Sequence, residues 1–133
     1  MIRTIVAVLS GLVTWFVAAT LINFLIRAMV VGYAAAEPTM AFTLPMMIAR
    51  LSAGVVSSLA AGFASSAVAR GNAALVYILG TLLVLLFLPV HFKLWHVFPV
   101  WYHAFFLITL APLVLLGGAI QRRARSPRAL GPT

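Results

Sequence analysis

Four long stretches without an Asp, Glu, Lys or Arg residue dominate this sequence of 133 residues. They cover residues 4–26, 51–69, 71–92 and 94–121. A helix of about 20 mostly apolar residues crosses the ~30 Å hydrocarbon layer of a bilayer and satisfies its own backbone hydrogen bonds. None of the stretches has the alternating pattern of a barrel strand. We therefore expect an all-α integral membrane protein with four transmembrane helices, at about 4–31, 44–69, 73–91 and 99–121.

The composition agrees with this class of protein. The chain is 65% hydrophobic and 8% charged, whereas soluble domains are about 45–50% apolar and about 25% charged. A water-soluble domain of this size could not bury so much apolar surface. The formal net charge of +8 does not indicate nucleic acid binding, because most basic residues stand singly at the ends of apolar runs. We expect the lipid bilayer as the main partner and no nucleic acid.

The short connections between the stretches predict an antiparallel up-down-up-down bundle. It would form one transmembrane domain over residues 1–121, followed by a basic, flexible cytoplasmic tail over 122–133. In this topology one side of the membrane holds the larger group of basic residues, namely Arg3, Arg70, Arg122, Arg123, Arg125 and Arg128. The opposite side holds Arg27, Arg50 and Lys93. The positive-inside bias then places both termini in the cytoplasm, with the protein in the inner or plasma membrane.

Missing residue types exclude several kinds of chemistry. The chain has no cysteine, which rules out disulfides and Cys-ligated metal centres. Its one acid, Glu37, is too few for a carboxylate metal site or for paired-carboxylate catalysis. No motif for nucleotide binding or for an activated serine is present. The sequence favours a protein that is not an enzyme, and it predicts no metal site.

Most of the remaining polar residues gather toward the outer boundary of the predicted bundle. Arg27 and Arg50 each lie about 30 Å along their helices from the inner boundary. There they either anchor the helix ends by snorkelling or form a functional charge. The candidate ligand or partner residues on this outer face are Asn23, Arg27, Glu37, Arg50, His91, Lys93, His96 and His103. Such a basic surface attracts an anionic lipid headgroup, a substrate carboxylate or an acidic partner. Alternatively, Glu37 pairs with one arginine and the other residues face water or lipid phosphate.

The segment between the last two helices is rich in histidine and aromatic residues. Trp95, Trp101 and Tyr102 are the rings that we expect at headgroup level. His91 closes one helix and His103 begins the next, so two imidazoles could ligate a haem. Otherwise the histidines are hydrated or bonded to loop carbonyls. Zinc bound by the three histidines matches no strong spacing rule. We expect no cofactor, with haem as the one alternative.

Small residues recur every four positions along the helix over 44–69, at Gly54, Ser58, Gly62 and Ser66. Small side chains at this spacing let two helix backbones approach closely within a membrane. The partner would be another helix of the same chain, a second copy in a homo-oligomer, or a subunit of a larger membrane complex.

Three functional hypotheses follow from these patterns. The first is a small multi-pass membrane protein that acts by helix packing, as a non-enzymatic accessory or scaffold subunit. The second is a small transporter or lipid-handling protein with an anion-attracting site on its outer face. The third is a haem- or quinone-binding membrane anchor that uses His91 and His103.

Overall fold

Four long helices make up most of the computed structural model, which describes residues 1–125. They are α1 (Ile2–Met29), α3 (Leu44–Val68), α4 (Ala73–Lys93) and α5 (Val100–Arg125). Each is long and apolar enough to cross a membrane, and the described residues contain no strand. The prediction of an all-helical chain with four helices of spanning length is confirmed.

One boundary differs from the expectation. We expected the flexible tail to begin at residue 122, but α5 continues through Arg122 and Arg123 to Arg125. The carbonyl oxygen of Ala67 on α3 accepts a hydrogen bond of 3.3 Å from Nη1 of Arg125, which ties the end of the helix to its neighbour. The rest of the predicted tail, residues 126–133, lies outside the described residues and includes Arg128.

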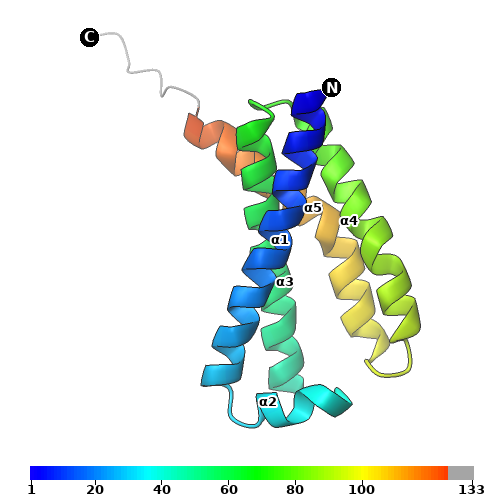
Figure 1. The fold of residues 1–133 in the computed structure, drawn as a ribbon. Coiled ribbons are helices and arrows are strands. Elements are labelled where there is room, and N and C mark those ends of the chain that lie inside the picture. Colours follow the sequence, from blue (N-terminus) through cyan, green and yellow to red (C-terminus); the bar gives the residue numbers. More distant parts are fainter. Residues whose placement is uncertain (126–133) are drawn as a thin grey trace.

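The connection between α1 and α3 is more structured than the sequence indicated. It contains a single helical turn, α2 (Tyr33–Ala36), and the 3-10 turn η1 (Glu37–Thr39). Gly32 precedes α2 with a φ of 81°, a left-handed conformation that glycine adopts without steric cost. Tyr33 is fully buried, in a cluster with Ile26 and Met46. The connection therefore folds back against α1 and α3 at the end of the molecule opposite the N-terminus (Figure 1).

Helix α3 lies between α1 and α5, and half of the residues in its most apolar stretch are buried inside the molecule. The small residues explain how the backbones meet. A Cβ atom built on Gly62 would lie 1.8 Å from the carbonyl oxygen of Val114, and one on Gly117 would lie 2.1 Å from that of Leu59. Here α3 and α5 touch backbone to backbone. The recurring small residues thus lie in contacts within the chain.

Two side-chain hydrogen bonds continue these contacts. The Ser58 hydroxyl accepts a bond of 3.1 Å from the Trp15 indole of α1, and the Ser66 hydroxyl donates one of 2.9 Å to Gln121 of α5. Each satisfies polar atoms of two buried residues, which is what such groups need away from water. The small-residue row therefore binds α3 to both of its neighbours.

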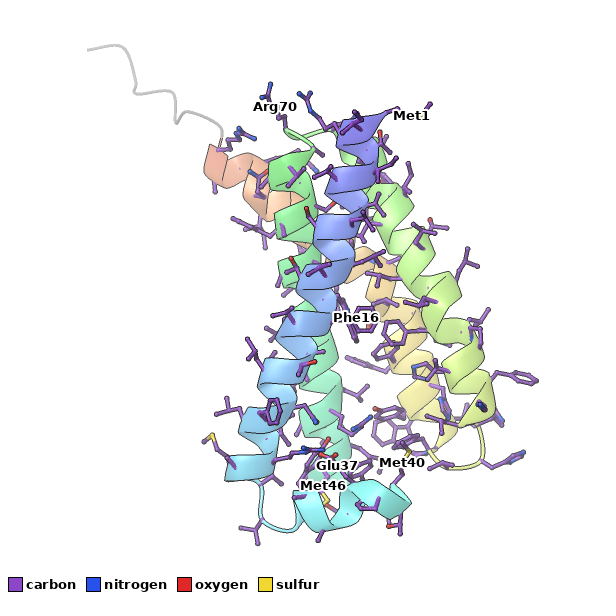
Figure 2. The ribbon with its side chains drawn as sticks, in the orientation of Figure 1. Met1, Phe16, Glu37, Met40, Met46 and Arg70 are labelled. Atoms are coloured by element: carbon purple, nitrogen blue, oxygen red, sulfur yellow. The ribbon has the colours of Figure 1, made fainter. Side chains whose placement is uncertain are left out.

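The two ends of the molecule differ in how closely the helices approach. Met1 and Arg70 lie at one end, and Glu37 and Met46 at the other (Figure 2). Toward the second end, α4 and α5 diverge from α1 and α3 (Figure 1). Large rings fill the region where the separation begins, with the centroids of Trp15 and Phe87 4.5 Å apart.

Candidate functional site

A cavity of about 470 Å³ lies among α1, α3, α4 and α5 in the half of the molecule where the helices diverge. Three of its lining residues, Phe16, Phe24 and Val90, are 46%, 59% and 45% exposed. Phe16 and Phe24 belong to α1 and Val90 belongs to α4. The cavity therefore opens to the outside of the bundle between α1 and α4.

Most of the cavity wall is apolar. The residues without a polar side chain are Phe16, Ala19, Phe24, Ala53, Gly54, Phe87, Val90, Leu94, Phe98 and Phe106. The charged or strongly polar ones are Asn23 and Arg27 from α1, Arg50 from α3, and His91 from α4. An apolar chamber with a few convergent polar groups is the usual form of a small-molecule site.

Arg50 is the central cation of this cavity. Its Nη1 donates a hydrogen bond of 2.9 Å to the Tyr33 hydroxyl, and its Nε donates one of 3.3 Å to the Tyr102 hydroxyl. The guanidinium carbon lies 4.8 Å from the centre of the Phe42 ring, within cation–π range. These partners orient the guanidinium but carry no negative charge.

The sole acidic side chain of the protein pairs with the other arginine. Nε of Arg27 donates a hydrogen bond of 2.6 Å to Oε1 of Glu37, and Nη2 of Arg27 pairs with Oε2. This hydrogen bond holds the pKa of Glu37 below its ordinary value of 4.5, so the carboxylate is ionised at neutral pH. Asn23 donates to the same carboxylate and accepts from the Tyr33 hydroxyl, at 3.5 and 3.0 Å. The network joins the ion pair to Arg50 through neutral groups only.

Arg50 is consequently a partly buried cation that forms no ion pair of its own among the described residues, and Glu37, whose pKa it also lowers, is already paired with Arg27. A charge removed from water is costly unless a counter-charge compensates it. An anion bound in the cavity would provide the missing compensation.

His91 and His103 form a close pair at the edge of the cavity. Their Nδ1 atoms are 2.7 Å apart, and both side chains are buried. The His103 ring stacks on Trp95, with centroids 5.0 Å apart and planes at 15°. A haem iron would have to sit between the two ligating nitrogens, about 2 Å from each. Nδ1 atoms joined by a hydrogen bond leave no room for an iron between them, and ligation of a haem through the other ring nitrogens stays a prediction.

The structure brings together six of the eight polar residues selected from the sequence. Asn23, Arg27, Arg50 and His91 line the cavity, and Glu37 and His103 bond directly to lining residues. Lys93 and His96 are instead exposed, at the end of α4 and in the following turn. Within residues 1–125 there is no group of three His, Cys, Asp or Glu side chains that could hold a metal ion.

Two functional side chains were missed or misplaced by the sequence reasoning. Tyr33 falls in a segment that we took for a loop, yet its hydroxyl binds both Arg50 and Asn23. Tyr102 was expected among the rings at headgroup level, but it is 5% exposed and faces Arg50. Pro99 predicts where α5 begins but not which of its faces turns inward, so the sequence carried no signal for this contact.

Comparison with protein-family models, with curated proteins and with solved structures finds no match. What this chain does is therefore inferred from the cavity and from the residues that line it.

Proposed function

We propose that the chain is an integral membrane protein whose four long helices cross the bilayer up-down-up-down. The outward faces support this, since large apolar side chains such as Leu21, Leu85 and Ile108 are 63%, 59% and 70% exposed. Arg70 lies at the same end as the N-terminus (Figure 2). The positive-inside bias then favours cytoplasmic termini and the inner or plasma membrane.

Within this membrane protein, we propose that the cavity binds an acidic amphiphile, a molecule with an anionic head and an apolar tail. The observation that carries the proposal is Arg50, a partly buried cation without an acidic partner in an otherwise apolar chamber. The head would sit at the Arg50 guanidinium, which prefers oxyanions. The tail would lie along Phe16, Phe24 and Phe87 and leave between α1 and α4 into the lipid.

The same contacts weigh against the other two hypotheses. An accessory subunit that docks through the small residues of α3 needs that row free, whereas Gly62 is against α5 and Ser58 against α1. A neutral quinone would leave the charge of Arg50 uncompensated. Lipid handling is the hypothesis that gives both the cavity and its cation a role.

The test is a binding titration of the purified protein in nanodiscs with two probes of equal chain length, dodecanoate and dodecanol. We expect dodecanoate to bind at least about tenfold more tightly, and Arg50→Gln to remove that preference, because one charge-assisted contact is lost. Arg70→Gln is the matched control, since Arg70 is exposed at the opposite end. Equal binding of the two probes, or unchanged dodecanoate binding by Arg50→Gln, would contradict the proposal.

A further inference from the structure

The contact between the two histidines restricts where each ring carries its proton. A neutral imidazole has one N–H, so in a bond between two Nδ1 atoms one ring donates and the other accepts. The donating ring then has a bare Nε2, and the accepting ring carries its proton on Nε2. Which ring donates depends on the surroundings of the two Nε2 atoms.

Those surroundings differ between the rings. Nε2 of His103 is completely buried and has no hydrogen-bond partner among the described residues. His91 lines the cavity. Its Nε2, unlike that of His103, is not a completely buried atom without a hydrogen-bond partner. Buried N–H groups without an acceptor are rarer in proteins than unsatisfied acceptors. His103 is therefore the donor with a bare Nε2, and His91 keeps an N–H on Nε2 that is available to the cavity.

A second proton on the pair would have no hydrogen-bond acceptor among the described residues. The only vacant nitrogen is Nε2 of His103, where a new N–H would be sealed away from any acceptor. The ionisable or charged groups around the pair are Arg50 on α3, Tyr102 on α5, the Arg27–Glu37 pair across the cavity, and exposed Lys93 and His96. Their one negative charge is already paired with Arg27, so the two histidines have no acidic partner among the described residues.

The fixed charges of the cavity add up to one positive charge. Arg50 contributes one positive charge, the Arg27–Glu37 pair contributes none, and the neutral histidine pair contributes none. A single negative charge neutralises this cavity, whereas a second would remain uncompensated in an apolar chamber, which is costly.

We propose that the cavity selects amphiphiles with a monoanionic head, a carboxylate, sulfonate or phosphodiester, over those with a dianionic head. The head is held between the Arg50 guanidinium on α3 and the Nε2–H of His91 on α4. This inference rests on the proposed function and specifies its ligand. It assigns His91 as a neutral hydrogen-bond donor, positioned by His103.

The tautomers are tested without any ligand, by ¹⁵N NMR of the protein labelled at histidine. We expect an acceptor-type Nδ1 and a protonated Nε2 for His91, and the reverse for His103. His96, which is exposed, serves as the internal reference for a solvated ring. A protonated Nδ1 on His91, or a bare Nε2 on that ring, overturns the inference.

The charge preference is tested with dodecyl sulfonate, a monoanion at every pH used, and dodecyl phosphate, whose second pKa is about 6. At about pH 8 we expect the sulfonate to bind about tenfold more tightly, and at about pH 5.5 the phosphate to approach it. Sulfonate affinity should stay constant between the two pH values. Methanesulfonate, which has the head without the tail, should bind far more weakly, and equal binding would show a free-anion site instead.

Three variants give the matched comparisons. His91→Phe should weaken sulfonate binding about fivefold through loss of one neutral donor, and His96→Phe should leave it unchanged. Glu37→Gln leaves Arg27 unpaired and raises the cavity charge to two, so it should shift the preference toward the dianion.

Arg50-dependent binding with a dianion preference at about pH 8 overturns this inference but keeps the proposed function. Binding that does not depend on Arg50 overturns both.

Discussion

The two halves of helix α3 pack against the neighbouring helices in different ways. Around Gly62 its backbone touches α5 directly, with no side chain between the two helices. About 18 Å along the helix, at Arg50, large side chains and a guanidinium hold the neighbouring helices apart around a cavity. Gly54 lies between, where an added Cβ would meet only the edge of the Phe106 ring, at 3.0 Å. One helix thus anchors the molecule at one end and forms a wall of its cavity at the other.

For the proposed membrane protein, this difference separates a closely packed half of the molecule from a half that contains a cavity. Helix association in lipid relies on close van der Waals packing, because burying apolar groups gains little when the solvent is also apolar. The contact around Gly62 concentrates that packing at one end. The other end can then tolerate an open chamber and a partly buried cation.

The largest effect is expected from Gly62→Ala. The new Cβ would lie 1.8 Å from the carbonyl oxygen of Val114, so the two helices must separate, at a cost of about 3 kcal/mol. Gly80→Ala is the control, because its Cβ would make ordinary contact with Ala111 at 3.6 Å. Unfolding in mixed micelles measures both. Equal stability of the two variants would show that the backbone contact does not hold the bundle together.

Ligand binding should stabilise the half of the molecule that contains the cavity. A saturating monoanionic amphiphile, at about 100 times its Kd, should raise the free energy of unfolding by about 2.7 kcal/mol. Thermal unfolding with and without dodecyl sulfonate at submicellar concentration measures this. Arg50→Gln should lose the stabilisation while keeping the fold. If dodecyl sulfonate stabilises Arg50→Gln as much as the unmodified protein, Arg50 does not hold the ligand in the half that contains the cavity.

A smaller effect is expected at the border between the halves, from Ser58→Ala. The substitution leaves the buried Trp15 indole N–H without its acceptor, which costs about 1–2 kcal/mol. Ser52→Ala is the matched control, because Ser52 is exposed and bonds only to the carbonyl one turn before it. Urea unfolding followed by tryptophan fluorescence measures both variants. A loss for Ser52→Ala as large as that for Ser58→Ala would contradict this assignment.

The smallest effect should come from acid. The pKa of Glu37 is lowered in the folded protein by its hydrogen bond from Arg27, so the pair stabilises the fold above the ordinary pKa of 4.5. That contribution is lost as the pH falls through the lowered folded value. Because Arg27 is 44% exposed, the loss should be slight. Melting temperatures of the protein and of Glu37→Gln should differ at neutral pH and converge as the pH falls from 4.5 through the lowered folded value. A difference that persists once Glu37 is protonated would exclude this pair as its source.

Part of the candidate site could be predicted from the sequence and part could not. Arg27, Arg50 and the histidines stood out because ionisable residues beside apolar runs are few in this chain. Their roles could not be separated, since the sequence does not say which arginine Glu37 joins. The pairing of Glu37 with Arg27 follows from the folding of α2 and η1 against α1, in a segment with no strong helical pattern of its own.

The sequence by itself determined the class of fold, because long uncharged apolar stretches have one stable form in lipid, the helix. It also marked α3 as the helix of closest packing, since small residues every four positions lie on one helix face. Only the tertiary structure decided that Tyr102 turns inward to Arg50, that His91 meets His103, and that a cavity remains between α1 and α4. These outcomes depend on the angles at which helices cross and diverge. Those angles are set by all of the side chains at each contact together, so no short stretch of the sequence displays them.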